Sequence, residues 1–235
     1  DRPIVQELQF TILPPTYTGE DEFQHPGNIT DISIPEGSRV RLTGKSSKTL
    51  DSAWLFLDEI PNVLYVQKNK LSGTFHIKSK TNAAIYVQDE NGVRNLHPPN
   101  YRFSIIPDSP PELIVQNPNR KFELDESDII GFDIQTSDDY GFSNAWIEYR
   151  IKAPDYLAQD TTLYKRNIAE IQRDVKSQQL YHEWNISEFS LAPEDELHIQ
   201  VIIADNNTLS GPSLTYSPIL IGRFPSLEDL SLTSI

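Results

Sequence analysis

Cysteine and methionine are both absent from the 235 residues of this chain. The lack of cysteine excludes disulfide bonds, thiolate metal sites and cysteine nucleophiles. Long apolar runs are also missing, so the sequence predicts no membrane-spanning helix, and it shows no signal peptide. Because the chain begins abruptly at Asp1-Arg2-Pro3, we expect a piece of a longer protein whose membrane anchor lies outside this sequence.

Basic residues are scarce, since 20 lysines and arginines stand against 34 aspartates and glutamates, for a net charge of −14. Nucleic acids and anionic membrane surfaces are bound by clustered Lys and Arg, so neither is expected as a direct partner. The sequence contains no Gly-x-Ser-x-Gly elbow, phosphate loop or dinucleotide fingerprint. We therefore predict a protein that is not an enzyme and needs no cofactor, apart from the calcium considered below.

What the sequence does contain is an approximate internal repeat. Ala53-Trp54 aligns with Ala145-Trp146, and a Pro-Pro dipeptide opens each copy. Each copy ends with an apolar strand that runs into an acidic turn, at residues 85–89 and 201–205. A duplicated unit of about a hundred residues is typical of proteins built for reach, spacing or binding.

Apolar residues alternate with polar ones along most of the chain, as in Leu8-x-Phe10-x-Ile12, which is typical of strands with one buried face. Clusters of Pro, Gly, Asn and Asp separate these short strands. We predict an all-β protein of two tandem immunoglobulin-like (fibronectin III-like) β-sandwich domains. The first covers residues 1–108, the second covers 109–225, and residues 226–235 begin a C-terminal helix or linker.

Two segments depart from this alternation. Three prolines within residues 107–111 predict a short, semi-rigid connection between the domains. Residues 158–176 are polar and carry apolar residues at helical spacing, but a sandwich needs a strand here. We therefore favour a strand over residues 163–169.

Trp54 and Trp146 stand at the same place in both copies. They are either ligand-stacking platforms or the core anchors of the two sandwiches, like the buried tryptophan of immunoglobulin domains. Because tryptophan is highly buried on average in folded proteins, we predict that both belong to the structural core.

The acidic turn Asp138-Asp139-Tyr140-Gly141 is the sharpest candidate for a metal site. Calcium prefers carboxylate and carbonyl oxygens, and Asp205 could add a further ligand if its turn lies at the same end of the domain. The structural alternative is that Asp caps the turn while Gly141 supplies a positive φ. The first copy has Ser46-Ser47-Lys48-Thr49 at the matching turn, which favours this alternative.

The five histidines are scattered along the chain. No pair has the short spacing of a zinc site, although His182 and His198 could meet across strands. We expect ordinary strand positions that face solvent. The five are His25, His76, His97, His182 and His198.

Residues 14–19 (Pro-Pro-Thr-Tyr-Thr-Gly) and 35–38 (Pro-Glu-Gly-Ser), followed by Asp-Asp-Tyr-Gly at 138–141 and by the stretch from Trp184 to Asn207, form a set of short motifs. This set resembles the periplasmic modules of a group of large bacterial membrane proteins, the domain of unknown function 4175 family. The resemblance covers most of residues 1–225. It implies transmembrane helices upstream, immunoglobulin-like modules in the periplasm and a long helical region downstream, and it implies no catalytic residues.

The sequence and this resemblance together predict a non-catalytic interaction or scaffold region of a membrane-anchored bacterial envelope protein, located in the periplasm or outside the cell. Its expected partners are other envelope proteins or other regions of the same parent chain. One alternative is a calcium-dependent adhesion or carbohydrate-binding module, with Asp138, Asp139 and Asp205 as ligands. Another is an accessory domain of a larger envelope enzyme.

Overall fold

The computed structural model describes residues 1–192 and 194–224, and the chain divides into two compact units, Asp1–Asp108 and Ser109–Ile235. We call these units module 1 and module 2. The proline-rich segment 107–111 lies between the last strand of module 1 and the first strand of module 2 and carries no strand itself. Residues 226–235, which were predicted to begin a helix or linker, lie outside the described residues.

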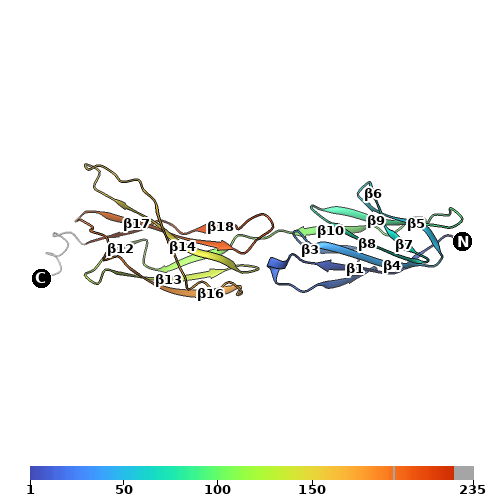
Figure 1. The fold of residues 1–235 in the computed structure, drawn as a ribbon, viewed down its shortest axis with the longest axis horizontal. Helices are drawn as coiled ribbons and strands as arrows, with labels where there is room; N and C mark the ends of the chain where they lie inside the picture. The colour runs from blue at the N-terminus through green and yellow to red at the C-terminus, as the bar shows by residue number, and fades with distance from the viewer. Residues whose placement is uncertain (193, 225–235) are drawn as a thin grey trace. The chain divides into compact units, whose positions relative to one another are not determined.

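Module 1 is a sandwich of two five-stranded sheets (Figure 1). One sheet has the strand order β2-β1-β4-β8-β7, and the other has the order β3-β10-β9-β5-β6. Neighbouring strands are antiparallel except for β3 and β10, which run parallel. The strands are β1 (Val5–Leu13), β2 (Phe23–Pro26), β3 (Asp31–Pro35), β4 (Arg39–Ser46), β5 (Leu50–Leu57), β6 (Ile60–Val63), β7 (Tyr65–Gln67), β8 (Lys70–His76), β9 (Thr81–Asp89) and β10 (Tyr101–Ile106).

Module 2 has a related plan with a smaller sheet, β11-β13-β16, and a larger one, β12-β19-β17-β14-β15, in which β18 also pairs with β17. β12 runs parallel to β19, as β3 does to β10. Two packed sheets with this strand order define an immunoglobulin-like sandwich, so the predicted fold is confirmed for both modules. The strands are β11 (Glu112–Asn117), β12 (Lys121–Glu123), β13 (Ile129–Ser137), β14 (Phe142–Lys152), β15 (Tyr164–Asn167), β16 (Ser177–Asn185), β17 (Glu196–Asp205), β18 (Leu214–Tyr216) and β19 (Leu220–Arg223).

Because apolar residues alternate with polar ones along each strand, one face of each sheet buries its side chains in the hydrophobic core between the sheets. In β4, for example, Val40 and Leu42 are fully buried, while Arg39, Arg41 and Thr43 beside them are exposed. The rings of Phe10, Phe75 and Phe103 meet edge to face in module 1, with centroid distances of 5.5 and 5.9 Å to Phe103. Burial of each such side chain contributes about 1.5–3 kcal/mol, so these two cores are the main source of stability.

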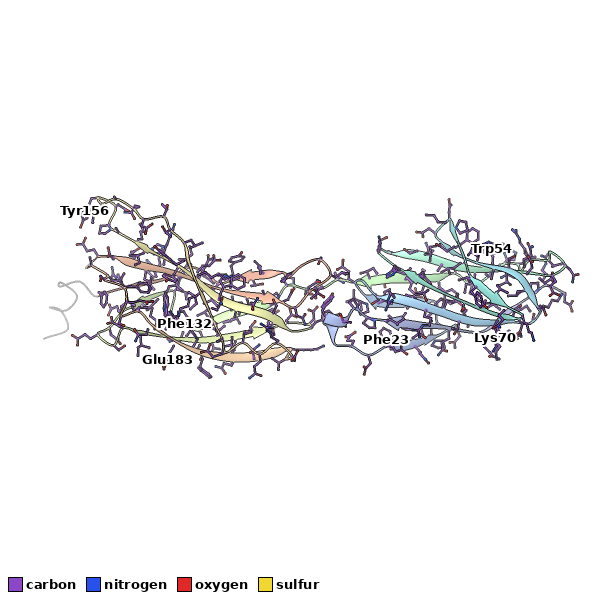
Figure 2. All side chains as sticks on the ribbon, in the orientation of Figure 1. Phe23, Trp54, Lys70, Phe132, Tyr156 and Glu183 are labelled. Atoms are coloured by element: carbon purple, nitrogen blue, oxygen red, sulfur yellow. The ribbon has the colours of Figure 1, made fainter. Side chains whose placement is uncertain are left out.

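Neither Trp54 nor Trp146 belongs to the main core of its module. Trp54 is half-buried, whereas Trp146 is buried, at 8% exposure, in a separate small cluster with Ile202 and Ala204. The residues on either side of each tryptophan are the ones buried in the two main cores. Successive side chains of a strand point to opposite faces, so both tryptophans lie on the outer faces of their sheets. The Arg94 guanidinium lies 5.1 Å from the ring centre of Trp54 (labelled in Figure 2), and the Lys165 ammonium lies 3.8 Å from that of Trp146.

The tryptophan that occupies the main core of module 2 is Trp184, on β16. It is fully buried in module 2, where its ring lies 4.6 Å from that of Tyr149 and 5.7 Å from that of Phe189. The sequence analysis gave Trp184 no core role. The signal was nevertheless present, because Leu180, His182 and Trp184 alternate along the strand and all three are buried.

Part of the segment 158–176 forms β15, so the prediction of a strand there is confirmed. The motif at residues 14–19 forms a short 3-10 turn, Thr16–Thr18. In this turn the Thr18 hydroxyl donates a hydrogen bond of 2.8 Å to the carbonyl of Pro15, and Gly19 ends the turn with a φ of 65°. In the part of the chain that the structure describes, no helix is both long and apolar enough to cross a membrane.

Candidate functional site

Strand pairing brings two polar turns together at one end of module 2. Residues 138–141 join β13 to β14, and Asp205 is the last residue of β17, directly opposite Phe142 in the ladder. Asn206 ties the two turns, because its backbone N–H donates to the carbonyl of Gly141 at 3.1 Å and its side-chain amide donates to that of Tyr140 at 2.9 Å. The two turns therefore lie at the same end of the domain, as the calcium hypothesis required.

The three predicted aspartates use their oxygens in the same way. One oxygen of Asp138 accepts two backbone N–H groups of its own turn, both at 2.8 Å. One oxygen of Asp205 likewise accepts two backbone N–H groups at 3.0 Å, and one oxygen of Asp139 accepts the N–H of Ser109 at 3.2 Å. The second oxygen of each carboxylate is buried and accepts no hydrogen bond. Asp205 itself is 0% exposed.

The charges of these carboxylates act on one another. Burial raises the pKa of the Asp138 carboxyl above its usual value, and the negative charges of Asp139 and Asp205 raise it further. The two backbone N–H groups that Asp138 accepts act in the opposite direction and do not cancel the effect. Three carboxylates thus lie at this end of module 2, and their mutual repulsion and burial disfavour the charged form of Asp138.

The turn-capping role predicted as the structural alternative is also present. Gly141 has a φ of 117°, and a Cβ there would lie 2.5 Å from the carbonyl oxygen of Arg173. Among residues 1–192 and 194–224, no group of three or more His, Asp or Glu side chains is already arranged to hold a metal ion.

The histidines His182 and His198 do not meet. They lie on β16 and β17, which belong to different sheets. His182 Nδ1 is hydrogen-bonded to both carboxylate oxygens of Glu170 at 3.0 and 3.1 Å, and His198 Nε2 to Glu196 at 2.7 Å. The expectation that the five histidines face solvent was wrong for His182, which is 8% exposed, and for His198, whose side chain is 13% exposed.

Exposed apolar side chains gather on the same outer edge of both modules. β6 and β15 are terminal strands of corresponding sheets, and each pairs on one side only with the strand that carries the repeated tryptophan. Ile60 and Val63 on β6 are 69% and 81% exposed, and Leu163 beside β15 is 61% exposed. Tyr156, also exposed, lies at the tip of the loop that leads to β15 (Figure 2). These positions were not identified from the sequence, because strand order decides which strand is an edge.

Module 1 also contains a cavity of about 640 Å³ that the sequence analysis missed. It lies beside the first residues of β1 and the loop before β10, and its lining includes Ile4, Leu8, Leu96 and Pro98. Tyr101 closes one side and donates a hydrogen bond of 2.7 Å from its hydroxyl to the carbonyl of Gly27. The volume lies in the range of small-molecule sites, and the lining is mainly apolar.

No family model and no curated protein matches this chain. Solved structures that resemble it include the fibronectin III-like modules of CbhA from Clostridium thermocellum, with 9% identity, coverage of 84% of this chain and 91% of that chain, and a TM-score of 0.31. A marsupial T cell receptor matches with 11% identity, coverage of 94% and 73%, and a TM-score of 0.39. A candidate membrane-anchored protein of Corynebacterium diphtheriae matches with 10% identity, coverage of 92% and 59%, and a TM-score of 0.29. At these identities and scores none of them assigns a function.

Proposed function

We propose that this chain is a non-catalytic protein-interaction region, and that the outer edges at β6 and β15 are its docking places. The observation that carries the proposal is the exposure of apolar side chains on the corresponding edge of both modules, led by Val63 and Leu163. An edge strand presents unpaired backbone N–H and C=O groups, and a partner strand can add to them while apolar side chains supply contact area.

The setting of this function is also a proposal. The motifs shared with the domain of unknown function 4175 family support a periplasmic position within a membrane-anchored bacterial envelope protein. The net charge of −14 supports a protein partner rather than nucleic acid or an anionic lipid surface. Other envelope proteins or another region of the parent chain would be the partners.

Site-specific photo-crosslinking in the producing cells tests the docking edges. A photoreactive phenylalanine analogue at Val63 or Leu163 should give a discrete cross-linked product with a protein partner. The same analogue at Arg41, which is exposed on the central strand β4, is the matched control and should give none. Val63→Lys should remove the product obtained from neighbouring positions without changing the unfolding midpoint. Equal products from Val63 and Arg41, or none from either edge, would contradict the proposal.

A further inference from the structure

The two modules carry the same aspartate at the same place in the fold. Asp89 ends β9 opposite Leu50, and Asp205 ends β17 opposite Phe142, with a bulge directly after each of these pairs. Asp89 and Asp205 are 2% and 0% exposed. One oxygen of each carboxylate accepts two backbone N–H groups of the turn that follows. The two sites therefore share the strand end and the capping of the following turn, although that turn is longer in module 2, and they differ in the surroundings of the second oxygen.

The facing turns also correspond residue by residue. The Ser46 hydroxyl accepts the N–H of Lys48 at 3.3 Å, and a carboxylate oxygen of Asp138 accepts the N–H of Tyr140 at 2.8 Å. The backbone N–H groups of Ser46 and Asp138 each donate to a carbonyl just before the next strand of the same sheet. Lys48 of module 1 thus stands where module 2 has Tyr140.

The chemistry at the second oxygen is opposite in the two modules. In module 1 the Lys48 ammonium lies 3.3 Å from the second oxygen of Asp89. In module 2 the second oxygen of Asp205 is buried without a hydrogen bond, and so are the second oxygens of Asp138 and Asp139 in the turn that Asn206 ties to Asp205. None of the ion pairs formed by the described residues involves these three aspartates. A buried carboxylate without a counter-charge is costly, so this oxygen calls for a cation.

We propose that module 2 binds a calcium ion between Asp205, Asp138 and Asp139, and that this ion replaces the lysine ammonium of module 1. The donors are all oxygens, which favours a hard cation over zinc. Calcium accepts six to eight oxygens in a flexible shell that includes carbonyls and water, whereas magnesium demands a rigid octahedron. Binding draws the 138–139 turn toward Asp205, because the three carboxylates are not yet arranged as a closed shell. Since one oxygen of each carboxylate already accepts a backbone N–H, we expect a Kd of about 10⁻⁴–10⁻³ M, as in extracellular calcium modules.

The test is thermal unfolding of the 235-residue chain in EDTA and in millimolar calcium, together with calorimetric titration of calcium. Calcium at about ten times the Kd should raise the midpoint of the module 2 transition, because the ion binds the native state alone. Asp205→Asn should abolish both the rise and the titration heat, since the amide keeps the turn-capping oxygen but loses the charge. Asp89→Asn is the matched control at the equivalent position of module 1, and it should leave the calcium response unchanged.

A second variant keeps the test decisive if Asp205→Asn fails to fold. Tyr140→Lys places the lysine of module 1 at the corresponding position, so it should abolish calcium binding and raise the midpoint measured in EDTA. No rise and no titration heat in the wild type would overturn the proposal. A rise that magnesium reproduces equally, or that Asp205→Asn retains, would also overturn it, because it would reflect general screening of the net charge. The outcome is independent of the docking edges, which are tested without calcium.

Discussion

Replacing Trp54 by alanine should cost far less stability than replacing its neighbour Leu55. Leu55 is 1% exposed and belongs to the core of module 1, where a leucine-to-alanine change costs about 2–5 kcal/mol. Trp54 is half-buried on the outer face, and its specific contact is the Arg94 guanidinium at 5.1 Å. A cation–π contact at such a site is worth about 0.5–1 kcal/mol, so Trp54→Ala should cost about 1 kcal/mol. A tryptophan that anchored the core would instead cost about 3–5 kcal/mol.

Urea unfolding followed by far-ultraviolet circular dichroism measures both changes. Trp54→Ala leaves only Trp146 and Trp184, so the tryptophan fluorescence of that variant follows module 2 alone and provides an internal control, whereas Leu55→Ala retains the signal of Trp54. The module 2 transition should stay where it is, while the module 1 midpoint falls strongly for Leu55→Ala and slightly for Trp54→Ala. Equal losses in the two variants would refute the assignment of Trp54 to the outer face.

Three further changes give measurable outcomes. Gly141→Ala should cost more than about 3 kcal/mol in thermal unfolding, because φ is 117° and the new Cβ would meet a backbone carbonyl, whereas Gly19→Ala, with open space around it, should cost about 1–2 kcal/mol. Tyr101→Phe should cost about 1 kcal/mol in urea unfolding, since it removes a 2.7 Å hydrogen bond to a backbone carbonyl. Burial raises the pKa of Glu170, but the hydrogen bond from His182 and backbone N–H groups outweigh it and hold that pKa below its usual 4.5. The stabilisation from Glu170 is therefore complete above pH 4.5 and disappears as the pH falls through the lower folded value, so Glu170→Gln should flatten this part of the midpoint-against-pH curve; an unchanged slope would contradict it.

The sequence predicts the sandwiches because their strands alternate strictly and their turns use residues with defined backbone roles. The segment 163–169 lies in a region whose apolar residues have helical spacing, yet it contains the strand β15, which pairs with β14. Pairing with a neighbouring strand therefore outweighs the local pattern here. Capping by Asp138 follows from the same local chemistry. Strands and turn caps, which depend on residues close in sequence, can therefore be predicted from the sequence.

The sequence could not predict which sheet face each tryptophan occupies, because both faces of β5 are apolar. Ala53 and Leu55 alternate with Trp54 and Phe56, so the period identifies two sets without saying which set faces the core. The large size of tryptophan favoured placing Trp54 in the core, but Ala53 and Leu55 occupy the core positions of β5. The edge position of β6 was hidden for another reason, because it depends on strand order, which the local pattern does not encode.

The internal duplication separates what the fold requires from what one module adds. A buried aspartate at the end of β9 and of β17 is common to both copies, and the hydrogen bonds to the following turn give its first oxygen a structural role. Lysine at residue 48 completes that structural role in module 1. Asp138 and Asp139 instead add repulsion, at positions where module 1 has Ser46 and Ser47. Module 1 shows that the fold does not need carboxylates in this turn, so the mutual repulsion of Asp138 and Asp139 in module 2 points to a bound cation. The end of module 2 is therefore the first place to look for a ligand.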